Sequence, residues 1–329
     1  MPELNLDIHV TRGGSLESAH VVHGAVVDAS GALLAHARDP ARVTHWRSCA
    51  KPFQVMPFVQ EGGFEALGWG DEQLALACAS HGGEPEHVAL AASMLAGLGL
   101  DESALACGPL EPLSTRGAQV LRDAGASPTR LHNNCSGKHS AMLARAKSHG
   151  WPLDGYHRPD HPIQQACVAS VSRWTGVPDS ALGRGVDGCG VVEFALPLRN
   201  MATAYARLAD AAGQGDAGPR RVLGAIAAHP FLLGGTDRFD TILIQETGGR
   251  VISKVGAEGV HTALSLDRRI GVVVKAEDGG TRAQYPAMLR ALQYMDVLPA
   301  ELPPRLAAIL RRPILNTRGE VVGEIGPVA

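Results

Sequence analysis

The chain lacks long apolar segments and any marked excess of charge of one sign. No apolar run approaches the roughly 18–20 residues that a helix needs to span a bilayer. The 30 basic and 33 acidic side chains give a net charge of −3, without a long run of either sign. Nucleic acids and anionic membranes attract basic patches, so we expect no nucleic acid and no membrane as a partner.

The chain also lacks the marks of a secreted protein. Residues 1–5, Met-Pro-Glu-Leu-Asn, contain no basic segment that leads into an apolar one, so no signal peptide is expected. Six cysteines are scattered over 329 residues, unlike the dense disulfide framework of small secreted domains. We therefore expect a cytoplasmic protein with reduced thiols.

The two ends of the chain are rich in β-branched residues, and the middle is rich in alanine and leucine. We expect strands at residues 4–10, 20–27, 33–37, 241–245, 251–255 and 270–274, with short links that favour antiparallel neighbours. We expect helices at residues 71–78, 85–98, 285–295 and 304–310, and an exposed loop at residues 213–219. Asp160 and Pro162 are typical of an N-cap followed by an early-turn proline.

This pattern predicts an α/β (α+β) fold with an antiparallel sheet built from N- and C-terminal strands, helices packed on it and a helical middle region. A hydrophobic content of 45% and a charged content of 19% fit a globular protein with a large core. We expect a single domain over residues 1–329. It should be mainly sheet at about 1–45 and 240–329 and mainly helical at about 50–235.

The segment Ser48-Cys49-Ala50-Lys51 places a hydroxyl three positions before an amine, at an expected helix start. This spacing puts both side chains on one helical face, where a neutral amine can take the hydroxyl proton. The same Ser-x-x-Lys pattern is typical of acyl-transfer enzymes such as penicillin-binding proteins and β-lactamases. A helix start with a solvated lysine is the other interpretation of these four residues.

Two further segments offer a second pair of the same kind. Ser80 lies among small residues at 79–84, Ala-Ser-His-Gly-Gly-Glu, and Lys254 begins a Lys-x-Gly sequence on an expected strand. That sequence is similar to the Lys-Thr-Gly strand motif of the same acyl-transfer enzymes, so Ser80 and Lys254 are candidates for a second Ser–Lys couple. A helix C-cap and an edge-strand lysine are the alternative interpretations.

Polar residues are densest at 132–139, His-Asn-Asn-Cys-Ser-Gly-Lys-His, just before an expected helix. Cys135 and Lys138 lie in this run, and Cys189 lies in Asp-Gly-Cys-Gly at 187–190. Two thiolates and a third donor suit Zn²⁺, although a lysine must lose its proton before it can bind a metal. Buried thiols with a solvated lysine remain the other interpretation.

Six segments, taken together and in order, resemble the asparaginase II family, a zinc-containing group with a serine β-lactamase/glutaminase-like fold. They are residues 47–52, 79–81, 132–139, 187–190, 254–259 and 278–282. The run at 133–139 is the most specific of them. The resemblance implies that fold, a homodimer, and hydrolysis of L-asparagine to L-aspartate and ammonia.

The resemblance also implies roles for particular residues. Two Ser–Lys couples would carry the reaction, Ser48 with Lys51 and Ser80 with Lys254, although Lys275 is another strand lysine that could pair with Ser80. Zn²⁺ would be held by Cys135, Lys138 and Cys189, with water completing the site. We expect the substrate's α-carboxylate and α-amino groups to be held by Arg47, His139 and Asp187.

The chain departs from the expected pattern at two positions. Cys49 stands where a small residue such as alanine is expected, and Val255 stands where the acyl-transfer motif has threonine. Neither change removes a proposed catalytic group. The alternatives are a penicillin-recognising hydrolase or D-amino-acid peptidase, a glutaminase, or a non-catalytic ligand sensor. The first would be favoured by a Ser-Asp-Asn or Tyr-x-Asn motif in the middle of the chain, and we find neither.

Overall fold

The computed structural model describes residues 2–328, and the chain divides into two compact units. The first unit contains residues 2–49, 196–210 and 250–328. The second contains residues 50–195 and 211–249. The first unit therefore joins both ends of the chain, as the pattern of terminal strands predicts.

The first unit is built on a five-stranded sheet with the order β4-β3-β10-β9-β8. All neighbours are antiparallel, and β3 from the N-terminal part pairs with β10 from the C-terminal part, with Val26 opposite Val272. The strands are β3 Val22–Asp28, β4 Leu33–Ala37, β8 Val251–Val255, β9 Val260–Ser265 and β10 Ile270–Ala276. The predicted sheet of N- and C-terminal strands is confirmed.

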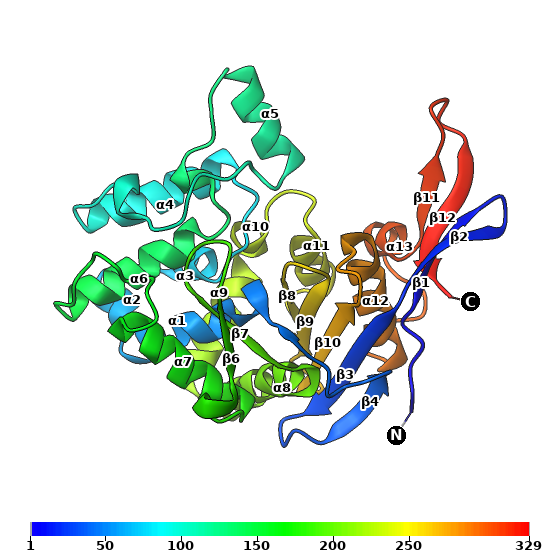
Figure 1. Cartoon of the computed structure of the whole chain (residues 1–329), viewed down its shortest axis with the longest axis horizontal. Coiled ribbons are helices and arrows are strands. Elements are labelled where there is room, and N and C mark those ends of the chain that lie inside the picture. Colours follow the sequence, from blue (N-terminus) through cyan, green and yellow to red (C-terminus); the bar gives the residue numbers. More distant parts are fainter. Residues whose placement is uncertain (1, 329) are drawn as a thin grey trace. The chain divides into compact units, whose positions relative to one another are not determined.

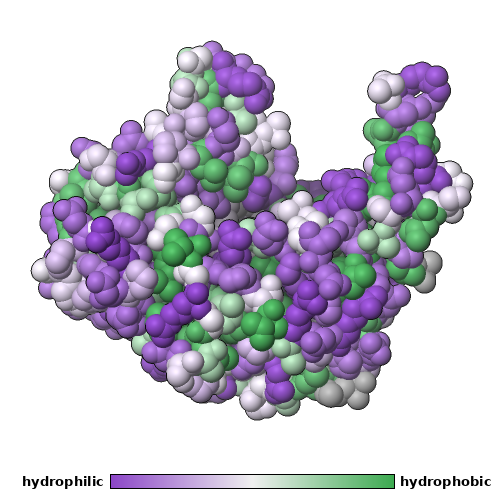
Figure 2. Space-filling view, viewed as in Figure 1, coloured by the Kyte–Doolittle hydropathy of each residue, from purple (hydrophilic) through white to green (hydrophobic). Residues whose placement is uncertain are grey.

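A second sheet of the same unit has the order β11-β12-β1-β2 (Figure 1). It again joins the two ends of the chain, because β1 pairs antiparallel with β12. The strands are β1 Ile8–Arg12, β2 Ser15–His20, β11 Arg312–Leu315 and β12 Val321–Pro327. Apolar side chains remain on the surface of the β11–β12 hairpin (Figure 2), among them Leu315 and Val321, which are 55% and 68% exposed.

Helices cover the first unit's large sheet. The first part of α8 (Leu198–Gln214) packs on β10 so closely that a methyl group at Gly271 would collide with the backbone of Ala202 and Ala206. Glycine is therefore needed at this position for the helix to approach the sheet. The remaining elements of the unit are β5 Val43–His45, α12 Thr281–Tyr294, α13 Pro304–Leu310 and the 3₁₀ turn η1 Arg47–Ala50, whose last residue belongs to the second unit.

The second unit is mainly helical, as expected for the middle of the chain. Helix α1 (Lys51–Gln60) packs against α7 (Pro162–Thr175), and α3 (Asp71–Ala77) packs against α6 (Ser136–Ser148) and α9 (Ala217–Ala228). The other helices are α2 Gly63–Ala66, α4 Pro85–Gly97, α5 Thr115–Asp123, α10 Pro230–Leu233 and α11 Phe239–Glu246. Short elements complete the unit: η2 Glu102–Ala104, η3 Arg130–His132, η4 Asp179–Ala181, and the antiparallel pair β6 Gly183–Val186 and β7 Val192–Pro197, whose last two residues belong to the first unit.

The strand predicted at residues 241–245 is wrong, because this segment lies in helix α11. A short β-branched run has no periodicity that separates a strand from a buried helix. The following residues end the helix: the N–H groups of Gly248 and Gly249 donate to the carbonyls of Gln245 and Ile244 at 3.0 and 2.8 Å. Strand β9, which the sequence did not predict, lies between β10 and β8 in the sheet.

Two smaller expectations also need correction. The N-cap of α7 is His161, whose Nδ1 accepts the N–H of Ile163 at 3.1 Å, and not Asp160. The loop expected at residues 213–219 is shorter, because α8 continues to Gln214 and α9 begins at Ala217. Over residues 2–328, every helix is too short or too polar to cross a lipid bilayer.

Candidate active site

Lys51 and Ser80 come together in the interior of the second unit. Lys51 is the first residue of α1 and Ser80 follows the end of α3; their side chains are almost fully buried. The amine Nζ of Lys51 lies 3.1 Å from the hydroxyl Oγ of Ser80. It also donates to the main-chain carbonyl of Ala79 and, at 3.4 Å, to that of Asn134. The lysine thus faces three neutral oxygens.

This arrangement favours proton exchange between Lys51 and Ser80. A carbonyl oxygen can only accept a hydrogen bond, whereas a hydroxyl can donate or accept. A neutral amine has two N–H groups and one lone pair. In the structure Lys51 Nζ donates to Ser80 Oγ and to both carbonyls; a neutral amine would keep the two carbonyl bonds and could accept the Ser80 proton with its lone pair.

Hydrogen bonds join the segment that begins at Ser80 to residues 233–236. The Ser80 N–H donates to the carbonyl of Leu233 at 3.1 Å. Four residues later, the buried carboxylate of Glu84 accepts both the N–H and the hydroxyl of Thr236, at 2.7 and 2.8 Å. Burial pushes the pKa of Glu84 up, but the bonds from Arg116 and Thr236 outweigh it, and the pKa lies below its usual range. The segments 80–84 and 233–236 are thus joined at both ends.

Close packing of α6 on α3 brings Asn134 beside Lys51. A methyl group at Gly137 would collide with the carbonyl of Leu76, so only glycine allows this approach. His81 adds a further tie: its Nδ1 accepts the N–H of Gly83 at 3.1 Å, so its Nε2–H donates to Ser136 Oγ at 2.9 Å. Burial lowers the pKa of His81 well below its usual value, and the ring stays neutral.

Ser48 lies in the first unit, in η1, directly after a residue with unusual backbone geometry. Arg47 has a φ of +54°, in the left-handed region that residues other than glycine rarely adopt. Such local strain is common at functional sites, where the surrounding structure must hold it. Here Tyr205 donates its hydroxyl to the carbonyl of Cys49 at 2.8 Å, and Cys49 Sγ donates to the carbonyl of Lys254 at 3.0 Å.

The main chain of Lys254, in β8, is therefore hydrogen-bonded to the segment that contains Ser48. The Lys254 side chain is 1% exposed, and its Nζ donates to the carbonyl of Val255 at 2.9 Å. Lys275, on β10, donates to the carbonyls of Glu258 and Ala276, each at 2.6 Å. Within the first unit, Lys254 and not Lys275 is thus tied to the segment that carries Ser48.

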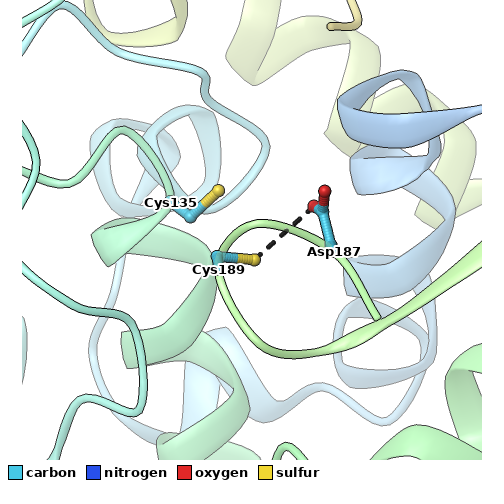
Figure 3. Close-up of side chains that lie close together, drawn as sticks. All are labelled: Cys135, Asp187 and Cys189. Carbon is cyan, nitrogen blue, oxygen red and sulfur yellow. Dashed lines mark hydrogen bonds between the residues drawn. The ribbon is translucent and has the colours of Figure 1, made fainter. Parts of the chain in front are cut away.

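Three candidate ligands meet in the second unit (Figure 3). Cys135 precedes α6, and Asp187 and Cys189 lie in the turn between β6 and β7. Their ligand atoms all lie within 4.8 Å of one another, and Cys189 Sγ lies 3.6 Å from Asp187 Oδ2. Lys138 Nζ joins them at 3.1 Å from Cys189 Sγ.

The pKa values of the two thiols are shifted in opposite directions. A hydrogen bond from Cys135 lowers the pKa of Cys189 to about 5, and the same bond together with burial raises the pKa of Cys135. Burial alone would lower the pKa of Lys138, but the two thiols and Asp187 outweigh it and raise the pKa. Sulfur donors within one ion's reach fit Zn²⁺, which binds thiolates at about 2.3 Å and carboxylates at about 2.0–2.2 Å. The donor set therefore suits this metal.

His139 lies next to Lys138 in α6 and is fully buried. Its Nδ1 lies 2.6 Å from the hydroxyl of Tyr156, which accepts the N–H of Ala106 at 2.8 Å. Burial and the neighbouring Lys138 charge lower the pKa of His139 to about 3, so the imidazole is neutral. Tyr156 was not found from the sequence, because an isolated tyrosine in a loop carries no motif.

The structure thus joins Lys51 to Ser80 and gathers Cys135, Lys138, Asp187 and Cys189. The couples predicted from the sequence, Ser48 with Lys51 and Ser80 with Lys254, each take one residue from each unit. They stay predictions. The carbonyls of Ala79 and Asn134 were not predicted as partners of Lys51, because main-chain acceptors have no sequence signal.

A family model described as L-asparaginase II matches residues 8–327. The chain belongs to the L-asparaginase II family. Membership indicates an amidohydrolase of the asparaginase type. The match covers almost the whole chain and includes residues of both units.

The other comparisons add little. None of the curated proteins matches this member of the L-asparaginase II family. Among solved structures, it is similar to a β-lactamase from Mycobacterium bovis, with 13% sequence identity and a TM-score of 0.36. That similarity covers 84% of this chain and 96% of the β-lactamase, and we base no functional conclusion on it.

Proposed function

We propose that the protein is an L-asparaginase that hydrolyses the side-chain amide of L-asparagine to L-aspartate and ammonia. The observation that carries the proposal is the buried amine of Lys51, which faces the Ser80 hydroxyl at 3.1 Å between two main-chain carbonyls. A lysine held in this way is suited to acyl transfer with a serine nucleophile. Membership of the L-asparaginase II family supports an amide as the substrate.

In the proposed mechanism, the Ser48 hydroxyl attacks the side-chain amide carbon and its proton passes to Lys51. Lys51 then returns a proton through the Ser80 hydroxyl to the leaving nitrogen. The C–N bond breaks, ammonia leaves, and an ester between Ser48 and the substrate's acyl group remains. The spacing of Ser48 and Lys51, three residues apart where η1 runs into α1, supports this pairing.

The second half of the reaction adds water to the ester. A water molecule gives up one proton, attacks the acyl carbon and releases L-aspartate, and Ser48 regains its hydroxyl proton. We propose Lys254 as the group that, with Ser80, takes the proton from water. Its support is the hydrogen bond from Cys49 Sγ to its main-chain carbonyl, which ties β8 to the segment of the nucleophile.

The substrate's charged groups need partners of opposite charge. We propose that Arg47 and His139 hold the α-carboxylate, since a guanidinium and a ring N–H both donate hydrogen bonds to carboxylate oxygens. Asp187 would hold the α-ammonium group. Asp187 lies beside Cys189, so the substrate-binding groups and the metal-binding groups would be neighbours.

We propose that Zn²⁺ is held by Cys135, Cys189 and a deprotonated Lys138, with water as the fourth ligand. When bound, the ion would fix the two thiolates and order the pocket wall; these electron-rich donors damp its Lewis acidity. The carboxylate of Asp187 is near enough to compete with Lys138 as the third protein ligand. Anomalous scattering at the zinc edge, on protein purified without chelator, tests the site directly.

Ammonia release from L-asparagine and L-glutamine, and ring opening of a chromogenic β-lactam, test the function, with the wild type and Ser48→Ala. We expect release from asparagine by the wild type and none by the variant. Faster turnover of glutamine would instead identify a glutaminase, and β-lactam cleavage would identify a penicillin-recognising hydrolase. Binding of asparagine without turnover would identify a sensor, and full activity in Ser48→Ala would exclude Ser48 as the nucleophile.

We also propose a homodimer and a cytoplasmic location. The homodimer is supported by the resemblance to the asparaginase II family. The location is supported by the six cysteines, all of them free thiols. Light scattering on the purified protein tests the homodimer: a mass of twice 34.4 kDa supports it, and a mass of 34.4 kDa at micromolar concentration contradicts it.

A further inference from the structure

The imidazole of His139 has one satisfied nitrogen and one that no residue of the described chain satisfies. Nδ1 lies 2.6 Å from the hydroxyl of Tyr156, whereas Nε2 is buried without a partner among residues 2–328. An unsatisfied buried polar atom costs free energy. A ring nitrogen in this state points to a ligand that the chain itself does not supply.

The hydrogen bonds of Tyr156 determine which ring nitrogen carries the proton. Its hydroxyl oxygen accepts the N–H of Ala106 at 2.8 Å, and among residues 2–328 its one other partner is His139 Nδ1. The O–H proton therefore has one acceptor, the lone pair of Nδ1. A ring nitrogen that accepts this bond carries no proton itself, so the ring proton is on Nε2 and the unsatisfied atom is a donor.

We infer that Tyr156 is a positioning residue that holds His139 in the Nε2–H tautomer, so that the ring offers a hydrogen-bond donor to a ligand oxygen. The inference rests on the proposed function for the identity of the ligand. A donor binds carboxylate or amide oxygens and repels an ammonium group. His139 would therefore bind an oxygen of the substrate. The α-ammonium group would be bound by a carboxylate such as that of Asp187.

Tyr156 is held firmly enough for this role. Its side chain is 1% exposed, and its main-chain carbonyl accepts the amide of Gln164 at 3.0 Å. Its ring meets the imidazole edge-on, with centroids 5.6 Å apart and planes at 79°. Contacts at three points on one residue leave its hydroxyl little freedom to turn away from Nδ1.

Nuclear magnetic resonance of the complete protein, labelled with ¹⁵N at histidine, reads the tautomer directly. The chain has 14 histidines, and the signals of His139 are assigned by their loss in His139→Gln. We expect a protonated Nε2 and an unprotonated Nδ1 in the wild type, and a mixture of tautomers in Tyr156→Phe. A protonated Nδ1 in the wild type, or an unchanged tautomer in Tyr156→Phe, overturns the inference.

Kinetics with L-asparagine test whether the tautomer matters for substrate. We expect Tyr156→Phe to raise KM about fivefold, the value of one hydrogen bond, with kcat nearly unchanged. In a His139→Gln background, Tyr156→Phe should raise KM no further, because Tyr156 affects substrate binding only by orienting the His139 imidazole. An additional fivefold rise in that background contradicts the positioning role.

Thr175→Val is a matched control for the loss of a buried hydroxyl. Thr175 is 1% exposed and its hydroxyl donates to the carbonyl of Val171 at 2.7 Å, in α7 of the same unit. It should lower the melting temperature as Tyr156→Phe does but leave KM unchanged. An equal rise of KM in both variants means that Tyr156 acts through stability alone.

A wild type that releases no ammonia from asparagine refutes the proposed function. The ¹⁵N resonances of His139 still decide the tautomer in that case.

Discussion

Two buried lysines of the second unit have opposite surroundings. Lys51, with no exposed side-chain surface, faces the carbonyls of Ala79 and Asn134 and the hydroxyl of Ser80. Lys138, 1% exposed, lies 3.1 Å from the sulfur of Cys189. One amine is surrounded by neutral dipoles and the other by negative charge.

The difference shows why burial alone does not define the role of a lysine. Neutral acceptors give the Lys51 amine hydrogen-bond partners without a compensating negative charge. Negatively charged thiolates stabilise the protonated form of the Lys138 amine. This amine could bind a metal ion only if the ion took the place of its proton. Lys51 is therefore suited to proton transfer, and Lys138 to a charge-balanced cluster of thiols.

The largest effect is expected when Lys51 loses its ability to take a proton. We expect Lys51→Met and Lys51→Arg each to lower kcat by about 10³-fold or more, because neither methionine nor a permanently charged guanidinium can act as a base. Ammonia release from asparagine measures the loss. The arginine variant keeps the charge, so more than a tenth of wild-type kcat in Lys51→Arg would mean that charge alone suffices.

Ser80→Ala tests the neutral partner of the same lysine. We expect kcat to fall about 10²-fold with KM nearly unchanged, because in the proposed mechanism the hydroxyl moves a proton in the transition state and does not bind the substrate. Ser140→Ala is a control: its buried hydroxyl donates to the Ser136 carbonyl at 3.0 Å, within the same helix. An equal loss of kcat in both variants would contradict a relay through Ser80.

The zinc content of variants tests the thiol cluster around Lys138. We expect Cys135→Ser to abolish bound zinc and Lys138→Met to weaken zinc binding about 10- to 100-fold, measured by competition with a chromogenic chelator. Asp187→Asn should keep the metal and raise KM for asparagine. If Asp187→Asn loses zinc while Lys138→Met keeps it, the carboxylate is the third ligand and the lysine is only its counter-charge.

Much of the fold follows from the sequence, and its failures have a physical origin. Strands β4 and β8 begin and end where the β-branched patterns predict. Strand β9, Val-His-Thr-Ala-Leu-Ser, was missed because it contains three polar residues, although all six residues are buried. It lies between β10 and β8, so its polar side chains are buried by neighbouring strands that its own sequence does not indicate.

The candidate site was predictable where it depends on side chains grouped in the chain. The Cys135–Lys138 run and the turn with Cys189 carry sulfur and nitrogen at recognisable spacing, and the structure brings them together. The partners of Lys51 are main-chain carbonyls, which every residue has. Tyr156 is 17 residues from His139, and nothing in the intervening sequence links them.

The smallest expected effect concerns the ion pair that joins the helices of the two lysines. Arg145, near the end of α6, donates to Glu61 at the end of α1 at 2.6 and 2.9 Å, and His149 adds a contact at 3.1 Å. Burial opposes ionisation of Glu61, but the Arg145 and His149 bonds outweigh it and hold the pKa below its usual 4.5. The pair therefore contributes stability above about pH 4.5, and this contribution is lost as the pH falls through the lowered pKa.

Because Glu61 is 36% exposed, solvent screens the pair, and we expect Glu61→Gln to lower the free energy of unfolding by only about 0.5 kcal/mol at pH 7. Urea unfolding at pH 7 and pH 3.5 measures the change, and the difference between wild type and variant should shrink at the lower pH. Glu320→Gln, in an exposed pair with Arg318 at 2.7 Å, is the control and should change stability less.

Since the Glu61–Arg145 pair lies at the ends of α1 and α6 away from Lys51 and Lys138, Glu61→Gln should leave both kcat and zinc content unchanged. A change in either would mean that the two lysine environments depend on the spacing of their helices and not only on their immediate partners.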